Sequence, residues 1–273
     1  MQNTNQPVFE RNTFKKRIST MLKVDFRRMF TSPFAYIMLG ISLVMPILIL
    51  VMTTMMDGTV SVNPQTGVET VIEGFDNVWQ VIGTLSSANA TGQMNMDMTA
   101  MCNINLIFFI SSVLVCVFIA DDFRSGYAKN LFTVRAKKGD YVISKSLVCF
   151  VGGALMIILF FVGAMLGGAI AGLPFDITGT SVGGIICCLL CKVLLVSVFT
   201  SLFTLMAVVG KQRLWLSLIC SLGASMLLFA MVPMITPLDA NIVNVILCLA
   251  GGALFSVGLG FVSKVILDKT SLV

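Results

Sequence analysis

Long unbroken apolar runs are the feature that most constrains how this chain can fold. Each run approaches or exceeds the ~20 residues that a helix needs to cross ~30 Å of hydrocarbon, and none alternates in segments of about ten residues as membrane β-barrel strands do. Hydrophobic residues make up 57% of the 273 residues and charged residues 11%, which excludes a water-soluble domain. We therefore predict an all-α membrane protein with six transmembrane helices, at residues 34–56, 104–120, 144–172, 183–210, 214–236 and 242–263.

Lysine and arginine are confined to one side of this six-span arrangement, which holds 17 of the 18 basic residues. Positive charge stays on the cytosolic side of a membrane, so we expect a multi-pass protein of the cell membrane with both termini in the cytosol. The net charge of +5 then reflects orientation in the bilayer and not binding to nucleic acid. The loops predicted on the other side contain acidic residues but no lysine or arginine, and they are the external loop 57–103 and residues 173–182 and 237–241.

Residues 1–33 precede the first span, ahead of a single transmembrane domain at 34–273. We predict that they include an amphipathic helix lying in the lipid headgroup layer, with Asp25 interrupting its apolar face. Ser32-Pro33 predicts the bend at which the chain turns into the membrane. The apolar face comprises Phe14, Ile18, Met21, Leu22 and Met29, and the basic face comprises Lys16, Arg17, Lys23, Arg27 and Arg28.

Lys192 is the eighteenth basic residue, and it falls about a third of the way into the fourth predicted span. Charge inside a membrane is costly and often functional. Three interpretations stay open: contact with a substrate, a side chain that snorkels to the outer interface, and an ammonium group capped by a neighbouring carbonyl.

Cysteines at 187–191 and methionines at 94–98 have spacings that could bind a metal ion, but each set also has a purely structural explanation. Cys188 and Cys191 form a C-x-x-C motif beside Cys187, but the chain has no histidine to complete a ligand set, so packing between helices explains them better. The methionines of residues 94–98 have a spacing that can bind Cu(I), although a loop that re-enters the interface would also be rich in methionine. We therefore predict no metal site.

Small residues of the third span are expected to allow close helix packing, and they are Gly163, Gly167, Gly168 and Gly172.

Residues 121–145 form a dense polar segment between two apolar runs, with nine charged residues in twenty-five positions. Asp121 and Asp122 favour the start of a helix, because acidic side chains stabilise a helix N-terminus. Aromatic and apolar residues follow at about one-turn spacing, and Gly139-Asp140 marks a turn. A charged loop that only anchors topology would explain the basic residues. A short amphipathic helix across the cytosolic ends of two spans also explains the aromatic residues, which indicate a protein partner.

The spacing of Asp122, Gly126, Leu131, Arg135 and Lys145 resembles the first cytosolic loop of type-two ATP-binding-cassette (ABC) exporter permeases. In that family the loop forms a coupling helix that docks in a groove of the ATPase subunit. The topology of the whole chain is similar to that of the family, whereas the motif covers only residues 121–145. The motif departs from the family at three positions, where this chain has Asp122 for the usual Glu, Tyr127 for a common Thr and Val134 for a common Pro. The docking residues implied by the resemblance are Asp121, Asp122, Phe123, Arg124, Gly126, Tyr127, Lys129, Asn130, Leu131, Phe132 and Arg135, with Lys145 at the start of the third span.

The resemblance implies a permease subunit and not an enzyme. This chain contains no G-x-x-x-x-G-K-[ST] phosphate loop, so we expect ATP and Mg to be bound by an ABC-type ATPase, present in two copies. A second copy of the chain or a related permease would complete the transporter, and its export substrate would be a peptide, a lantibiotic, a drug or a lipid-like molecule. An ion-coupled secondary carrier and a non-transporting sensor or scaffold subunit are the alternatives. A membrane enzyme is disfavoured, because the chain has no histidine and no clustered carboxylates.

Overall fold

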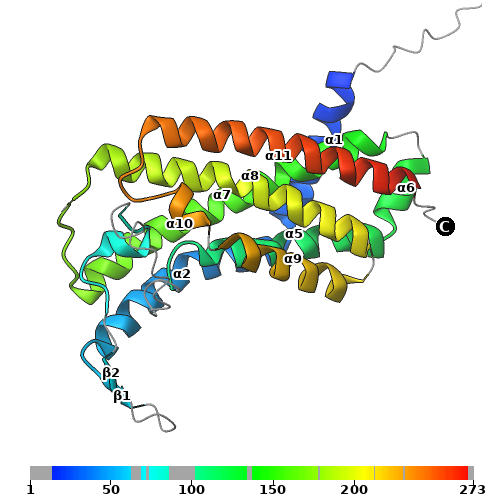
Figure 1. Ribbon diagram of the computed structural model, residues 1–273. Coiled ribbons are helices and arrows are strands. Elements are labelled where there is room, and N and C mark those ends of the chain that lie inside the picture. Colours follow the sequence, from blue (N-terminus) through cyan, green and yellow to red (C-terminus); the bar gives the residue numbers. More distant parts are fainter. Residues whose placement is uncertain are drawn as a thin grey trace, which may run out of the picture.

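The long helices lie side by side in a bundle (Figure 1). The computed structural model describes residues 14–62, 69–71, 74–85, 102–133, 137–177, 179–211, 213–229 and 231–269. Two short strands, β1 (Val60–Val62) and β2 (Glu69–Val71), pair antiparallel, and the 3-10 helix η1 (Val78–Val81) follows them. The α-helices are α1 (Phe14–Thr31), α2 (Pro33–Met56), α5 (Leu106–Arg124), α6 (Tyr127–Thr133), α7 (Lys138–Ala171), α8 (Val182–Gly210), α9 (Leu214–Phe229), α10 (Val232–Ile235) and α11 (Ile242–Lys269).

Five of the described helices, α2, α5, α7, α8 and α11, are long and apolar enough to cross a membrane. They match five of the six predicted spans and indicate an all-helical, multi-pass membrane protein. The remaining predicted span, 214–236, is divided into α9 with 16 residues and α10 with four. Pro233 lacks the N–H that would continue the α9 hydrogen-bond ladder, which explains the division. Because α9 is shorter than the ~20 residues of a full span, the count of six spans stays a prediction.

The outward surface of the bundle is rich in large apolar side chains, as a lipid-facing surface requires. Along α11, Ile242, Leu254 and Val257 are 70%, 71% and 73% exposed. An apolar surface of this extent is covered in a functioning protein by lipid or by another protein. The exposed residues thus agree with the membrane assignment that follows from helix length.

α7 is the central helix of the bundle and contacts α1, α2, α5, α8 and α11. Its glycines let α2 approach closely: a Cβ atom at Gly163 would lie 2.2 Å from the backbone oxygen of Leu43, and one at Gly167 would lie 2.8 Å from the Cα atom of Ile47. The predicted packing role of these two glycines is confirmed. Gly172 has a different role, because it ends α7 with a left-handed φ of 72°.

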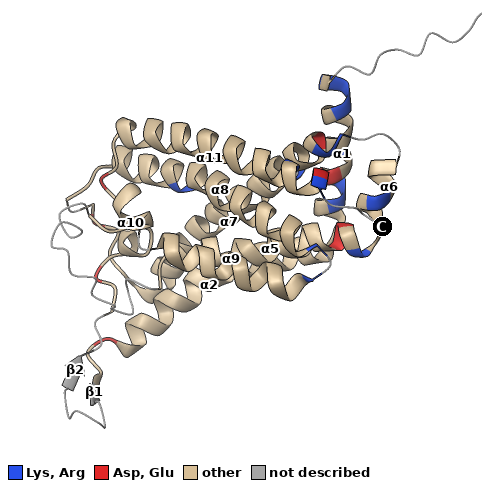
Figure 2. Cartoon of the chain, turned by 45° about the vertical axis from the view of Figure 1, so that its right-hand side comes forward, with Lys and Arg blue, Asp and Glu red and all other residues tan. Residues whose placement is uncertain are grey.

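Charged residues are segregated along the bundle (Figure 2). Most lysines and arginines lie at the end that carries α1, α6 and the C-terminal end of α11, which we call the basic end. At the opposite end, the described residues include Asp57, Asp76, Asp176 and Asp239. Lys192 is the exception, since it lies within the bundle on α8. The described residues begin with α1 and stop with the end of α11, and both lie at the basic end.

α1 runs crosswise to the long helices at the basic end (Figure 1). Ser32 has an extended backbone, with φ −77° and ψ 125°, and separates α1 from α2 at the predicted bend. The buried side chains of α1 are Met21, Asp25 and Met29. Asp25 thus belongs to the face of α1 that contacts the bundle, and its position among apolar residues needs a specific partner.

Candidate functional site

The predicted coupling segment lies at the basic end, but its helix begins later than predicted. α5 continues through Asp121 and Asp122 to Arg124, so the two aspartates lie in its last turn and do not start a new helix. The prediction of a helix start at Asp121 is wrong because ion pairs inside the protein neutralise Asp122, which allows the apolar helix to continue past residue 120. Gly126, with a φ of 73°, then turns the chain into the seven-residue α6.

The residues predicted to dock a partner divide into buried and accessible groups. Asp122 and Phe123 are buried, with 0% and 7% of their surface exposed. Arg135 lies outside the described residues, as do the methionines of residues 94–98. The half-buried residues are Gly126, Tyr127, Leu131 and Phe132, and the exposed residues are Asp121, Arg124, Lys129 and Asn130.

The aromatic side chains of this segment pack on the chain itself. Phe123 and Phe132 meet the ring of Tyr141 edge-on, with ring centroids 6.5 Å and 5.4 Å away. The guanidinium carbon of Arg28 lies 4.0 Å from the ring centroid of Tyr127. The aromatic residues are therefore not the exposed surface that the sequence pattern predicts. The accessible part of α6 is polar instead.

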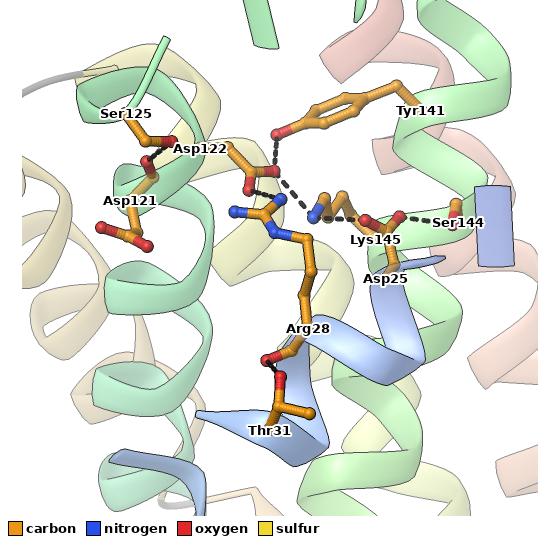
Figure 3. A network of polar contacts seen from close by, with 9 residues as sticks. All are labelled: Asp25, Arg28, Thr31, Asp121, Asp122, Ser125, Tyr141, Ser144 and Lys145. Carbon is orange, nitrogen blue, oxygen red and sulfur yellow. Dashed lines mark hydrogen bonds and ion pairs between the residues drawn. The ribbon is translucent and has the colours of Figure 1, made fainter. Parts of the chain in front are cut away.

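A buried ion-pair network joins α1, α5 and α7 (Figure 3). The Lys145 ammonium lies 2.8 Å from Oδ1 of Asp25 and 2.7 Å from Oδ2 of Asp122, and all three side chains are fully buried. Arg28 donates to Oδ1 of Asp122, which links α1 directly to the last turn of α5. Lys145 therefore bridges two carboxylates from different helices, one on α1 and one on α5.

Hydroxyl groups complete the hydrogen bonding of both carboxylates. The Tyr141 hydroxyl donates to Oδ2 of Asp122 over 2.9 Å, and the Ser144 hydroxyl donates to Oδ2 of Asp25 over 2.6 Å. Lys145 also lies 4.1 Å from the ring centroid of Phe118. Buried charges are tolerated when they are paired and hydrogen-bonded, and both conditions are met here.

The network is electrically balanced. Two cations, Lys145 and Arg28, face two anions, Asp25 and Asp122. Burial lowers the pKa of Arg28 and the Asp122 carboxylate raises it, and the net result is a raised pKa, so the guanidinium stays charged. An additional ion pair near the edge of the network, between Arg17 and Asp140 at 3.0 Å, attaches the first half of α1 to the start of α7.

Lys145 lies within α7 and not at the start of that helix. α7 begins at Lys138, so Lys145 follows two helical turns after the start, and its place at the mouth of the membrane span stays a prediction. The 34 residues of α7 extend over about 51 Å at 1.5 Å per residue. This length exceeds the ~30 Å hydrocarbon layer, which leaves the first turns of α7 free to hold the network at the basic end.

Lys192 forms a second polar site inside the bundle. Its ammonium donates to Oδ1 of Asn105 over 2.8 Å and to Oγ1 of Thr236 over 2.9 Å, and its side chain is 0% exposed. Of the three interpretations of the sequence, snorkelling to the interface is excluded by this burial. The ammonium is capped by the side-chain carbonyl oxygen of Asn105, just before α5, and by the hydroxyl of Thr236, just after α10, which agrees with the interpretation of a lysine capped by a neighbouring carbonyl.

Sequence reasoning missed most partners of the network. Asp25 was visible as an acid on an apolar helix face, and that anomaly is the signal that could have identified it. The sequence places Arg28 on the basic face of α1, whereas the structure shows it bound to Asp122 of α5. Tyr141 and Ser144 carried no signal, because their partners lie far away in the sequence or on another helix.

Among the described residues there is no group of three or more His, Cys, Asp or Glu side chains that could hold a metal ion. Cys188 and Cys191 are buried and form no disulfide bond, in agreement with a packing role. Comparison of the chain with known protein families, with curated proteins and with solved structures finds no match.

Proposed function

We propose that this protein is the membrane-spanning permease subunit of an ABC transporter that exports its substrate with the energy of ATP hydrolysed by a separate ATPase. The observation that carries the proposal is the placement of α6. This short helix lies at the basic end and presents polar residues such as Lys129 and Asn130 outward. It packs on the network through Tyr127, whose ring lies against Arg28, and through Phe132, whose ring meets Tyr141.

The network gives the proposed docking helix a rigid connection to the bundle. Asp122 lies four residues before Gly126 and holds both Arg28 of α1 and Lys145 of α7. A force applied to α6 by a closing ATPase would therefore move the ends of α1, α5 and α7 together. Because α7 contacts five other helices, such a displacement would reach the whole bundle and favour rocking between two access states.

The proposed assembly contains two ATPase copies, which bind ATP and Mg, and a second copy of this chain or a related permease. In this arrangement the basic end and both termini face the cytosol, and β1, β2 and η1 lie outside the cell. A peptide, lantibiotic, drug or lipid-like substrate agrees with an apolar groove of about 560 Å³ between α8, α9 and α11, which is lined by residues such as Phe199, Leu228 and Phe255.

An ion-coupled carrier is the second candidate, and Lys192 is the observation that favours it. Ionisable groups buried within a span often carry ions or protons. The partners of Lys192, Asn105 and Thr236, are however neutral. The two candidates differ in energy source: transport by an ABC permease stops when ATP is depleted at constant ion gradient, and transport by a carrier stops when an ionophore collapses the gradient at constant ATP.

Orientation can be tested by cysteine labelling in intact cells. Thr59→Cys, at the end opposite to α6, should react with a membrane-impermeant maleimide added outside. Lys129→Cys should react only after permeabilisation, and the unsubstituted protein reports the background from the native cysteines. Labelling of Lys129→Cys in intact cells would invert the proposed topology.

Docking can be tested by purifying the tagged chain from its own membrane. The proposal expects an ATPase with a phosphate-loop sequence to co-purify and to be lost with Lys129→Glu. Lys269→Glu is the matched control, because it reverses an exposed charge at the same end on α11. Equal recovery of the ATPase with both variants would place docking elsewhere, and a sensor or scaffold subunit would yield partners that lack the phosphate loop.

A further inference from the structure

A second cavity, of about 420 Å³, lies at the basic end between the C-terminal end of α1, the start of α2 and the last turns of α5. Its polar wall includes Arg28, Ser32 and Asp121, and its apolar wall includes Phe34, Leu114 and Phe118. None of the residues of α6 lines it, although Asp121, from the segment that precedes α6, does.

Along α5, the apolar lining residues are separated from the polar one. Since α5 ends at the basic end, Leu114 and Phe118 lie one to two turns closer to the bilayer centre than Asp121. Phe34 lies in the first turn of α2, next to the bend from α1 and close to the level of Ser32. The cavity is therefore polar at the level of α1 and apolar where the hydrocarbon begins, which is the polarity profile of a phospholipid.

The polar wall offers both a cation and an anion. Arg28 uses one nitrogen to bind Asp122, and a guanidinium has five N–H donors, so donors remain for a ligand. The Asp121 carboxylate points away from the network in Figure 3, and among the described residues only its backbone oxygen has a hydrogen bond, from Ser125. Ser32, at the N-terminus of α2, makes no capping hydrogen bond with its side chain.

Charge balance selects among headgroups. The charge of Arg28 is already offset within the balanced network, so Asp121 gives the cavity an excess negative charge. A purely anionic headgroup is disfavoured by this charge. A zwitterionic headgroup with a phosphate for Arg28 and an N–H-bearing ammonium for Asp121 satisfies both side chains, whereas a choline group has no N–H to donate.

We propose that this cavity binds a phospholipid whose headgroup is phosphoethanolamine, taken from the leaflet at the basic end. The phosphate contacts Arg28, the primary ammonium contacts Asp121, and an acyl chain follows the apolar wall along Phe34 and Leu114. The inference depends on the membrane assignment and is independent of the proposed ATP-driven function.

The test uses the purified full-length chain without any partner. The protein is placed in bilayer nanodiscs that contain equal amounts of phosphatidylethanolamine, phosphatidylcholine and phosphatidylglycerol, is released into detergent, and its retained lipids are identified by native mass spectrometry. We expect phosphatidylethanolamine to be retained several-fold over the other two. Soluble glycerophosphoethanolamine in excess should not displace it, because the acyl chain contributes to binding.

Asp121→Asn is the decisive variant, since this residue is exposed and the substitution removes the anion without touching the network. It should make retention of phosphatidylethanolamine and phosphatidylcholine equal. Asp176→Asn, the same substitution at an exposed site of the opposite end, should leave the preference intact. Equal retention of all three lipids by the unsubstituted protein, a preference for phosphatidylglycerol, or an unchanged preference in Asp121→Asn would each overturn the proposal.

Discussion

Replacing Lys145 with methionine removes the ammonium that lies between two buried carboxylates. In the variant, Asp25 keeps only the hydrogen bond from Ser144, while Asp122 keeps Arg28. The network changes from electrically neutral to a net charge of minus one in a fully buried site. Breaking a buried pair by removal of one partner costs about 3–5 kcal/mol, because the remaining charge is left without compensation.

This cost corresponds to a measurable loss of thermal stability. At about 2 °C per kcal/mol for a domain of this size, Lys145→Met should lower the melting temperature by about 6–10 °C. The measurement is the fraction of monodisperse protein that survives heating in detergent, followed by size-exclusion chromatography. Asp268→Asn is the control, because it breaks an exposed ion pair with Lys138 at 4.0 Å, and such pairs contribute less than about 1 kcal/mol.

A compensating double variant separates charge from packing. Asp25→Asn together with Lys145→Met restores neutrality and leaves the pair between Arg28 and Asp122 in place. We expect the double variant to recover at least half of the lost stability. If Lys145→Met alone is as stable as the unsubstituted protein, or if the double variant is less stable than the single one, the network does not hold the three helices together by charge.

Other perturbations test packing and backbone geometry in the same heating assay. Gly163→Ala should lower the free energy of unfolding by about 1–3 kcal/mol, because its Cβ atom would lie 2.2 Å from the Leu43 backbone oxygen. Gly251→Ala is the control and should leave stability unchanged, because a Cβ atom there meets nothing within 4 Å. Equal effects of the two substitutions would contradict close packing of α2 on α7. Gly126→Ala should lower the free energy of unfolding by about 1–2 kcal/mol because Gly126 has a left-handed φ, and Gly126→Asn should lower it less. If Gly126→Ala leaves stability unchanged, the turn before α6 is flexible. Lys192→Met should lower the free energy of unfolding less than Lys145→Met does, because it leaves only the neutral acceptors Asn105 and Thr236 without their donor. A larger loss of stability than in Lys145→Met would reveal an anionic partner of Lys192.

Apolar runs and charge placement were sufficient to predict five long apolar helices and the bend at Ser32-Pro33. They succeed because a membrane span needs a continuous apolar run and because proline restricts the residue before it. The same local reasoning misplaced the end of α5. Asp122 looks like a helix start when its partners are unknown, and those partners, Arg28 and Lys145, are 94 and 23 positions away in the chain.

Tertiary pairing also explains what remained hidden in the site. Asp25 and Lys145 are separated by 120 positions, and no pattern within one helix can reveal that they meet. Lys192 presents the same difficulty, because Asn105 and Thr236 reach it from two other segments. The division between α9 and α10 could have been foreseen from Pro233, whose missing N–H ends a helix.

A photocrosslink from α6 tests whether this helix is the contact site of an ATP-hydrolysing partner, as we propose. A benzoylphenylalanine residue placed at exposed Lys129 is activated in living cells, and the attached protein is sequenced. We expect an ATPase that carries a G-x-x-x-x-G-K-[ST] phosphate loop, with no such product from the same probe at Thr59. If Lys129 attaches only to proteins that lack this loop, or only to lipid, α6 is not the docking helix.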